Sequence, residues 1–403
     1  MNRRNFLGNS GKQLALIGLT GLSNTSMIDN DPTANRPVKD KSKMLYRTLG
    51  KTGIKLPIVS MGVMNASNPG LLKAAWDEGI RHFDTAWYYQ NGNNEKMVGS
   101  VLKELKVNRS EVTIATKILV DSLTGKEAKA LFLKMFDESL VRLQMDYVDI
   151  LYYHSASGSR QINDPYILEA FTELKKMKKI RFSGFSVHVD WPSILLDAAS
   201  RKFYDVILLS YNYSMFSDQR ISDAIKAAYD AGIGLIAMKT QCQQDWYKRN
   251  LSADQQKYYG ESNMNTALLK WALKNEYITT AIPGFTTYEQ LKEDMPVAYD
   301  LTLTREEEEF FKSKEVKLAV QSVCRHCGKC VATCPQNADI PSLMRTHMYS
   351  LSYGNPLMAK QTLSRIQPGK GLSACIGCTS CTSQCQHKVA IAERITELLE
   401  VYC

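Results

Sequence analysis

Apolar runs rich in β-branched residues alternate with helical patterns through the middle of the chain, and this alternation strongly constrains the fold. The strand-like runs are 56–62, 80–86, 112–118, 147–154, 180–187, 205–212, 232–239 and 277–283. The helical patterns between the later runs are 126–143, 165–179, 191–200, 219–231 and 265–275. Eight such units in about 255 residues predict a (β/α)8 TIM barrel in the α/β class. An open doubly wound sheet is the alternative, and the lack of a GxGxxG motif weighs against it. Segment 46–57 is expected to form a hairpin that closes one end of the barrel.

Eight of the ten cysteines form two runs of the pattern C-x2-C-x2-C-x3-C near the end of the sequence. In this pattern three thiolates of each run bind one [4Fe–4S] cluster, and the fourth reaches the other cluster. One predicted ligand set is Cys324, Cys327, Cys330 and Cys385. The other is Cys375, Cys378, Cys381 and Cys334. Zinc binding and disulfides are the alternatives that the spacing disfavours. The sequence therefore predicts two clusters in a small α+β ferredoxin-like domain, with a helical insert at 336–374.

The beginning of the sequence is typical of an export signal. Arg3-Arg4-Asn5-Phe6-Leu7 resembles the twin-arginine motif, and a short apolar stretch follows at 14–22. We therefore predict a protein exported by the twin-arginine machinery, periplasmic or membrane-tethered if the signal is not cleaved. The net charge of +9 comes without a basic patch interleaved with aromatic residues, so nucleic acid is not an expected partner. The expected segments are signal 1–28, linker 29–43, barrel 44–318 and iron–sulfur domain 319–403.

Four polar residues follow strand-like runs at the expected carboxyl-terminal rim of the barrel. Asp84, Lys117 and His154 close their runs, and Tyr89 lies five residues after Asp84. A lysine beside a phenol favours the phenolate and lowers the tyrosine pKa, while a carboxylate holds the lysine in place. A neutral histidine can donate to a carbonyl oxygen. Together these residues predict a tyrosine that exchanges a proton near neutral pH, opposite a hydride donor.

Three stretches carry a resemblance to a known family. FDTAWYYQNGNNEKMVG, IATK and DILYYH resemble the catalytic tetrad of the aldo-keto reductases, and the resemblance covers roughly 44–300. It implies that Tyr89 is the general acid/base, that Lys117 and Asp84 tune it, and that His154 orients the carbonyl. The tail at 320–403 is similar to that of an aldo-keto reductase branch with a fused ferredoxin-type domain.

The same resemblance implies a nicotinamide cofactor, NADP(H) with NAD(H) as the alternative. The residues implied to bind it are Ser186, His188, Met238, Lys239, Gly284, Phe285, Thr286 and Gln290. Four positions depart from the family pattern. Val187 and Asp294 stand where asparagine is common, Leu208 stands where a glutamine is usual, and Met238 replaces the aromatic residue that usually stacks on nicotinamide. The expected contacts to nicotinamide are therefore fewer than in the family.

The leading hypothesis is an exported oxidoreductase that transfers hydride between NADP(H) and a carbonyl or alcohol, a sugar-like substrate being one option. Its two clusters would exchange electrons with a redox partner protein. A second hypothesis is an electron-transfer protein whose barrel binds a ligand or partner without hydride chemistry. A third gives the clusters a structural role alone.

Overall fold

The computed structural model describes residues 40–120, 123–188, 191–241, 264–321, 323–378 and 380–403. The predicted export signal and nearly all of the predicted linker lie outside the described residues, so those predictions stay untested. Within the described ranges, no helix has both the length and the apolar character needed to cross a membrane.

Eight parallel strands form one sheet, in the order β10-β9-β8-β7-β6-β5-β4-β3. Their bounds are β3 Met61–Gly62, β4 His82–Asp84, β5 Thr113–Ile118, β6 Val148–Ala156, β7 Ile180–Val187, β8 Val206–Ser210, β9 Gly234–Met238 and β10 Ile278–Ala281. An isolated parallel bridge between Val59 and Ala281 brings the two edges of the sheet together. The result is a nearly closed barrel, which confirms the predicted TIM-barrel class.

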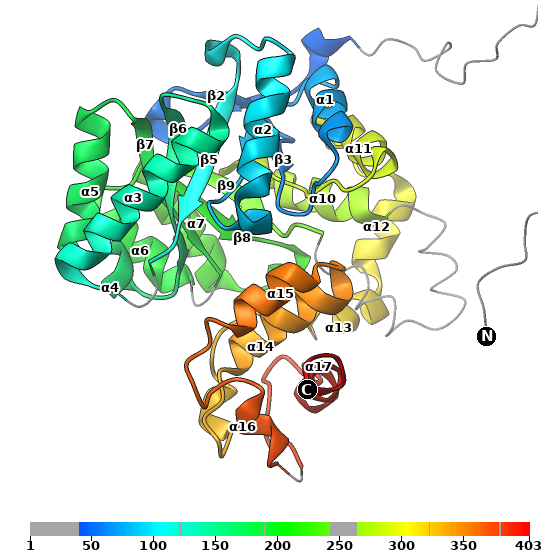
Figure 1. Ribbon diagram of the computed structural model, residues 1–403. Helices are drawn as coiled ribbons and strands as arrows, with labels where there is room; N and C mark the ends of the chain where they lie inside the picture. Colours follow the sequence, from blue (N-terminus) through cyan, green and yellow to red (C-terminus); the bar gives the residue numbers. More distant parts are fainter. Residues whose placement is uncertain (1–39, 121–122, 189–190, 242–263, 322, 379) are drawn as a thin grey trace, which may run out of the picture. The chain divides into compact units, whose positions relative to one another are not determined.

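Helices follow the strands and cover the outside of the barrel (Figure 1). They are α1 Pro69–Asp77, α2 Asn93–Glu104, α3 Gly125–Leu143, α4 Ser159–Ile162, α5 Pro165–Lys176, α6 Trp191–Arg201, α7 Gln219–Asp230, α10 Met264–Lys274, α11 Tyr288–Asp294, α12 Arg305–Lys312 and α13 Lys314–Gln321. Helix α7 shows why they form, since Ile221, Ala224, Ile225 and Ala228 recur at helical spacing on its buried face. The Asp218 side chain caps this helix by accepting a hydrogen bond from Arg220 N.

The predicted hairpin is present, but it changes the start of the barrel. Strand β1 (Tyr46–Thr48) pairs antiparallel with β2 (Lys55–Pro57). The run at 56–62, expected as one strand, is therefore divided between β2 and β3. The chain changes partner at Ile58, whose N donates to Leu45 O at the start of the hairpin at 3.0 Å and whose O accepts from Ala281 N of β10 at 2.9 Å. Buried Leu49 and Leu56 from this hairpin pack against Ile150 and Leu208 inside the barrel.

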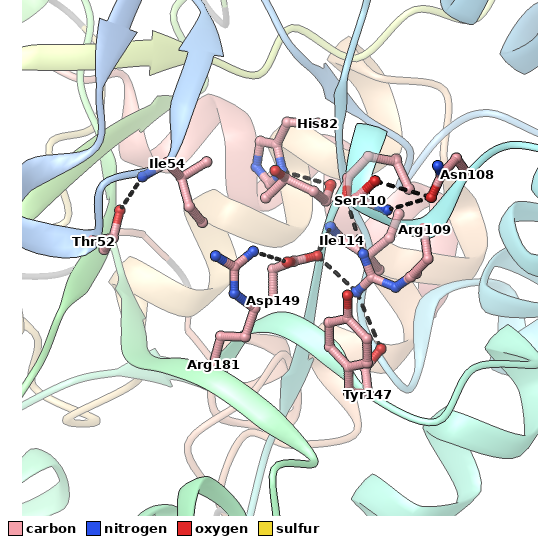
Figure 2. Close-up of polar contacts among 12 residues, drawn as sticks. Thr52, Ile54, His82, Asn108, Arg109, Ser110, Ile114, Tyr147, Asp149 and Arg181 are labelled. Atoms are coloured by element: carbon pink, nitrogen blue, oxygen red, sulfur yellow. Dashed lines mark hydrogen bonds and ion pairs between the residues drawn. The ribbon is translucent and has the colours of Figure 1, made fainter.

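A buried carboxylate joins three strands near their amino ends. Asp149 at the start of β6 forms ion pairs with Arg109 at 2.7 Å and with Arg181 at 2.8 Å (Figure 2). Its Oδ2 also accepts a hydrogen bond from Ile114 N of β5 at 2.9 Å. A buried charge is tolerated when its acceptor sites are satisfied in this way. Asp149 is therefore structural, and lies at the end of the barrel away from the strand termini that carry the site.

The last part of the chain is helical in the described residues. It contains α14 Ile340–His347, the π-helical turn η8 Met348–Ser352, α15 Pro356–Leu363, α16 Ser373–Ile376 and α17 Ile391–Tyr402. Its own apolar core includes Leu343, Ile391 and Leu398. The insert at 336–374 is helical as predicted. The strands expected of an α+β domain are not found among the described residues beyond 321, because the cysteine runs form turns and loops instead.

Helix α15 contacts the barrel within the compact unit formed by residues 41–403. Met358 and Ala359 share an apolar cluster with Tyr88 and Tyr89. A polar contact accompanies this packing, since Asn355 Nδ2 donates to Asn65 Oδ1 at 2.7 Å. The carboxyl-terminal segment therefore contributes directly to the surroundings of the barrel rim.

Candidate active site and cluster sites

The four polar residues expected at the barrel rim lie close together. Asp84 is the last residue of β4, Lys117 lies near the end of β5, and His154 lies on β6. Tyr89 opens the short 3-10 helix η3 (Tyr89–Gly92). The carboxyl ends of parallel strands meet at one rim, so the topology brings the strand-borne side chains together. All four residues are buried.

Lys117 links the members of this group. Its Nζ forms an ion pair with Asp84 Oδ1 and donates a hydrogen bond to Thr85 O at 2.6 Å. The same nitrogen lies 4.9 Å from the ring centroid of Tyr89. Burial lowers the pKa of Lys117, and the Asp84 carboxylate opposes that shift. Asp84 therefore holds the lysine beside the Tyr89 ring, as the sequence predicts.

The acidity of Tyr89 differs from the expectation. The pKa of Tyr89 is raised well above its usual value, with burial as the largest cause and Tyr88 and Asp84 adding to it. Lys117 does not reverse this shift because its Nζ is engaged by Asp84 and the Thr85 carbonyl. The expectation of a lowered pKa is therefore wrong for this structure. Tyr89 is a protonated phenol at neutral pH, a state that suits a proton donor.

Tyr88 contacts His154, a contact that the sequence analysis missed. The Tyr88 hydroxyl lies 3.3 Å from His154 Nε2, and the two rings stack with centroids 4.9 Å apart. The Tyr89 ring stands edge-on to His154, with centroids 5.9 Å apart. Burial raises the pKa of Tyr88 to about 12. The available signal was the pair of consecutive tyrosines, but the sequence does not show which ring faces the histidine.

His154 is a neutral imidazole. Burial lowers its pKa well below the usual value, and the charges of Lys117, Arg365 and Arg345 lower it further. Its Nδ1 has no hydrogen-bond partner among the described residues. A neutral ring still carries one N–H donor. This confirms the neutral state expected from the sequence and leaves His154 able to donate to an oxygen at the rim.

A cavity of about 250 Å³ opens beside this group and is named here the nucleotide cavity. Asp84 and Tyr89 line it. Seven of the eight residues assigned to the cofactor line it too: His188, Met238, Lys239, Gly284, Phe285, Thr286 and Gln290. The structure therefore brings most of the residues assigned to the cofactor to one cavity beside Asp84 and Tyr89.

Ser186 is the assigned residue that does not line the nucleotide cavity. It is fully buried in β7, and its Oγ accepts a hydrogen bond from Ser155 N at 2.8 Å. Ser155 has a φ of 55°, in the left-handed region, where the regular pairing of β6 with β7 is interrupted. Ser186 therefore satisfies a backbone donor at this irregularity, and the structure does not bring it to the cofactor side.

Two polar pairs line the remainder of the nucleotide cavity. The backbone N and the Oγ1 of Thr286 donate to Gln290 Oε1 at 2.8 and 3.0 Å. Gln241 Nε2 donates to both carboxylate oxygens of Asp294 at 2.9 Å. Burial raises the pKa of Asp294 to about 7. The sequence identified Asp294 as a departure from the family pattern but gave no role to Gln241, which lies in the turn three residues after the end of β9.

The carboxyl-terminal segment closes part of the nucleotide cavity. Tyr349 and Ser352 of η8 line it, together with Tyr353. Lys239 Nζ lies 5.2 Å from the Tyr349 ring centroid, and Lys239 has a φ of 58°, in the left-handed region. Such a backbone costs roughly 1–2 kcal/mol in a residue with a side chain. These contacts join segments more than one hundred residues apart, so local sequence patterns do not predict them.

One of the two predicted cluster ligand sets surrounds a cavity. Cys334 from the first run and Cys375, Cys378 and Cys381 from the second line a space of about 160 Å³. Burial raises the pKa of Cys375 to about 11, and the neighbouring thiols of Cys334, Cys378 and Cys381 add to the shift. The fourth cysteine of one run thus lies beside the first three of the other, as the ferredoxin pattern predicts.

The second set shows the reciprocal arrangement. Burial raises the pKa of Cys324 to about 12, and Cys385 and Cys330 add to the shift. Burial also raises the pKa of Cys330 to about 11, with Cys385 and then Cys327 adding to it. Cys385 of the second run is therefore close enough to Cys324 and Cys330 to act on both, and the neighbouring Gln386 Nε2 donates to Cys327 Sγ at 3.6 Å.

The surroundings of these thiols fit [4Fe–4S] ligation. The described cysteines of both runs are free thiols. Backbone N–H groups point at two of the sulfurs, from His326 to Cys324 and from His387 to Cys385, each at 3.4 Å. Hydrogen bonds to the sulfurs are one means by which a protein tunes a cluster. In the described residues, no three His, Cys, Asp or Glu side chains are arranged for a single metal ion, whereas a four-iron cluster takes its four thiolates on separate irons.

Comparisons with known proteins find relatives of both the barrel and the cysteine-rich part of the chain. Residues 64–257 match the aldo/keto reductase family, and residues 323–390 match the 4Fe-4S dicluster domain. The chain is 29% identical over 288 residues to L-galactose dehydrogenase of Arabidopsis thaliana, which covers 64% of this chain and 90% of the relative. It is 26% identical over 317 residues to L-glyceraldehyde 3-phosphate reductase of Escherichia coli K12, which covers 66% of this chain and 90% of the relative.

Solved structures show the same fold. The aldo-keto reductase AKR11C1 from Bacillus halodurans has a TM-score of 0.55 and 23% identity, over 68% of this chain and 99% of that one. The matched families and the fold together indicate an oxidoreductase with a TIM barrel and a carboxyl-terminal 4Fe–4S domain. More narrowly, residues 64–257 of the barrel are similar to the aldo/keto reductase family.

Proposed function

We propose that this protein transfers hydride between NADP(H) and a carbonyl or alcohol, coupled to electron transfer by two [4Fe–4S] clusters. One observation carries the proposal: Asp84 and Tyr89 line the same cavity as seven of the residues assigned to the cofactor. A nicotinamide bound there would supply the hydride next to a phenol that can exchange the proton. The substrate oxygen would lie against the Tyr89 hydroxyl.

The rim residues have complementary roles in this proposal. The raised pKa of Tyr89, caused mainly by burial, keeps its proton available at neutral pH for an oxygen that gains negative charge. His154, neutral and buried, helps to orient that oxygen. Lys117 fixes the Tyr89 ring and is itself held by Asp84. In the reverse direction Tyr89 would accept the proton of an alcohol only after losing its own, which the same raised pKa disfavours.

A link to the clusters is supported by a small cavity of about 50 Å³ between the two sites. His188 and Lys239, which also line the nucleotide cavity, line this one together with Cys324 and His326. A [4Fe–4S] cluster exchanges single electrons, whereas a nicotinamide passes two electrons together as hydride, so the coupling would require a carrier, such as a flavin, that splits the pair. The cysteine sets that would hold the clusters are the two described above. A redox partner protein would connect them to other electron carriers.

The substrate class follows from the rim chemistry and from the relatives. The names of the two curated relatives given above refer to a sugar and to a sugar phosphate. We infer a sugar-like carbonyl or alcohol for this chain as well. Replacement of the usual nicotinamide-contacting glutamine by buried Leu208 accords with weaker cofactor binding than in the family.

Export belongs to the same proposal and rests on the sequence, because Arg3 and Arg4 lie outside the described residues. The twin-arginine route carries folded proteins, which suits a chain that acquires its clusters before export. Cell fractionation of the protein with Arg3→Lys and Arg4→Lys tests it. Retention inside the cell is expected, and unchanged export of the double variant contradicts the route.

The decisive experiment compares tyrosine variants in protein purified without oxygen. Tyr89→Phe is expected to lower NADPH-dependent aldehyde reduction by roughly 10²–10⁴-fold, with iron content and NADPH binding unchanged. Tyr204→Phe is the matched control, because Tyr204 is also buried and its hydroxyl donates to Ile162 O, away from the four rim residues. If Tyr88→Phe abolishes turnover while Tyr89→Phe does not, the proton donor is Tyr88. Failure of the wild type to bind either nicotinamide nucleotide favours the electron-transfer alternative.

A further inference from the structure

A second and larger cavity, of about 840 Å³, adjoins the rim and is named here the arginine cavity. Tyr88 lines it, and the Tyr88 hydroxyl is the group 3.3 Å from His154 Nε2. His188 and Tyr349 line both the arginine cavity and the nucleotide cavity. The volume lies within the range of roughly 300–1,000 Å³ typical of small-molecule sites. A ligand in this cavity would therefore lie next to the reaction centre.

Three arginines from separate segments line this cavity: Arg160 of α4, Arg345 of α14 and Arg365 just after α15. Arg365 Cζ lies 4.0 Å from the ring centroid of Tyr88. Arg345 Nη2 donates to Ser342 Oγ at 3.3 Å. Within the described ranges, none of the three guanidinium groups has a carboxylate within ion-pair distance. Their charges are therefore available to a ligand.

The acidic residues that line the cavity are engaged elsewhere. Asp164 caps α5 by accepting hydrogen bonds from the backbone N of Tyr166 and Ile167 at 2.9 and 3.2 Å. Asp339 caps α14 by accepting from Ser342 N at 3.1 Å. A carboxylate at a helix N-terminus is stabilised by the helix itself. The two aspartates thus leave the cavity with an excess of positive charge.

Taken singly, each of these arginines could be an ordinary solvent-exposed side chain with no ligand. Two features favour a shared binding site instead. The three side chains reach one concave site from the barrel and from the described residues of 323–403, named here the cysteine-rich segment. Their field also reaches the reaction centre: after burial and Lys117, the charges of Arg365 and Arg345 lower the pKa of His154. A planar guanidinium matches carboxylate and phosphate geometry with paired hydrogen bonds.

We propose that the arginine cavity binds an anionic group of the substrate, a carboxylate, phosphate ester or sulfate ester. The reacting carbonyl of that molecule would lie toward Tyr88 and Tyr89. That a carbonyl is the reacting group of the bound molecule rests on the function proposed above. Anion binding in the cavity does not depend on that function. Arg345 and Arg365 would make substrate binding depend on residues of the cysteine-rich segment, which a barrel alone could not supply.

The test measures binding without turnover on the cluster-loaded protein. The probes share one scaffold: 4-carboxybenzyl alcohol, 4-(hydroxymethyl)phenyl phosphate and 4-(hydroxymethyl)phenyl sulfate, with methyl 4-(hydroxymethyl)benzoate as the neutral analogue. Calorimetry is expected to show at least one anion binding about tenfold tighter than the neutral ester, since a hydrogen bond to a charged group contributes about 1.5–3 kcal/mol. The tightest probe identifies the anionic group.

Variants locate the binding. Arg345→Gln and Arg365→Gln are each expected to reduce the anion preference to about one-third of its wild-type value or less, and Arg365→Lys to restore part of it. Arg305→Gln is the charge-matched control, because Arg305 of α12 is exposed and lies outside the cavity. Unchanged iron content establishes that each variant is folded.

The possible outcomes distinguish failure of the anion site from failure of the hydride transfer proposed above. Equal binding of the ester and all three anions overturns the arginine cavity as an anion site, as does a preference that survives both glutamine variants. Reduction of neutral aldehydes without anion preference contradicts this inference alone. Anion preference that depends on the arginines, in a protein that reduces no aldehyde, contradicts the proposed hydride transfer and leaves the anion site standing.

Discussion

At the scale of single residues, Asp294 is the group whose protonation should be easiest to detect. Its carboxyl is buried in the wall of the nucleotide cavity, and its pKa is raised by burial from the usual 3.8 to about 7. Below about pH 4 the folded and unfolded states both hold the proton. Between about pH 4 and 7 the unfolded chain loses the proton while the folded chain keeps it, so the free energy of unfolding falls as pH rises. Above pH 7 this cost is constant.

We therefore predict that Asp294→Asn stabilises the protein in a pH-dependent way. Asparagine keeps the size and can still bond to Gln241, but it has no proton to lose. The thermal midpoint should exceed that of the wild type by roughly 5 °C at pH 8 and by about half as much at pH 5.5. Thermal unfolding without oxygen, followed by circular dichroism, measures both values. A variant that is less stable by the same amount at both pH values would show that Asp294 is not protonated by folding.

Two side chains at the rim show where the sequence falls short at this scale. Lys117 was placed correctly because its strand-end position follows from the period of β5 and from parallel topology. The partner of His154 was not predicted, because it depends on which tyrosine ring turns toward the histidine. The raised pKa of Tyr89 was not predicted either, because it depends on burial by neighbouring segments. Tyr88 and Tyr89 are adjacent in sequence and chemically identical, so composition and spacing cannot distinguish them.

At the scale of elements, local patterns predicted most of the barrel. The run at 180–187 is β7, and the helical pattern at 126–143 lies within α3. Both have long, strong periodicity, which is the most reliable sequence signal. The π-helical turn η8 was not predicted, because it depends on contacts of Tyr349 with the barrel rim. The cluster ligand sets were predicted because their pairing is encoded in the spacing of the thiols.

Helix α15 offers an element-scale prediction about how the cysteine-rich segment holds the rim. Asn355 has two separate roles: Oδ1 caps α15 by accepting from Met358 N at 2.9 Å, and Nδ2 donates to Asn65 Oδ1 at 2.7 Å. Asn355→Ser should keep the cap and lose the longer contact, at a cost of about 1 kcal/mol. Asn355→Ala should lose both and cost about 1 kcal/mol more. Denaturant unfolding measures the difference.

The partner residue supplies the control for this prediction. Asn65→Ala should cost about as much as Asn355→Ser, and the double variant should cost little more than either single one, because the two residues share one hydrogen bond. Asn65 also lines the nucleotide cavity. Additive costs in the double variant would mean that the contact between α15 and the rim does not contribute to stability.

At the scale of the whole molecule, three cavities meet at one histidine. His188 lines the nucleotide cavity, the arginine cavity and the small cavity that reaches Cys324. It is neutral, because burial lowers its pKa well below the usual value and Lys239 and Arg345 add to the shift. A chain that only carried its clusters as structural supports would have no need for this convergence. The arrangement instead accords with a barrel site and a cluster site that operate together.

The crossed ligand sets give the last prediction, which concerns the whole cysteine-rich segment. Cys334 is the last cysteine of the first run in sequence but lies with Cys375, Cys378 and Cys381 around one cavity. Cys334→Ala should therefore remove the same cluster as Cys375→Ala, and iron content should fall from about eight to about four atoms per chain. The electron paramagnetic resonance spectrum of the reduced Cys334→Ala protein should overlay that of Cys375→Ala. Cys385→Ala should instead overlay Cys324→Ala.

Cys403 provides the control for this assignment. It fits neither run, yet its thiol contributes to the raised pKa of Cys375. Burial and the thiols of Cys334, Cys378 and Cys381 are the larger causes of that shift. Because it does not line the cavity, Cys403→Ala should keep both clusters. Loss of a cluster in Cys403→Ala with retention in Cys334→Ala would make the terminal cysteine the fourth ligand. If the spectrum of Cys334→Ala instead overlays that of Cys324→Ala, all four ligands of each cluster come from a single run, and the crossed ligand sets are wrong.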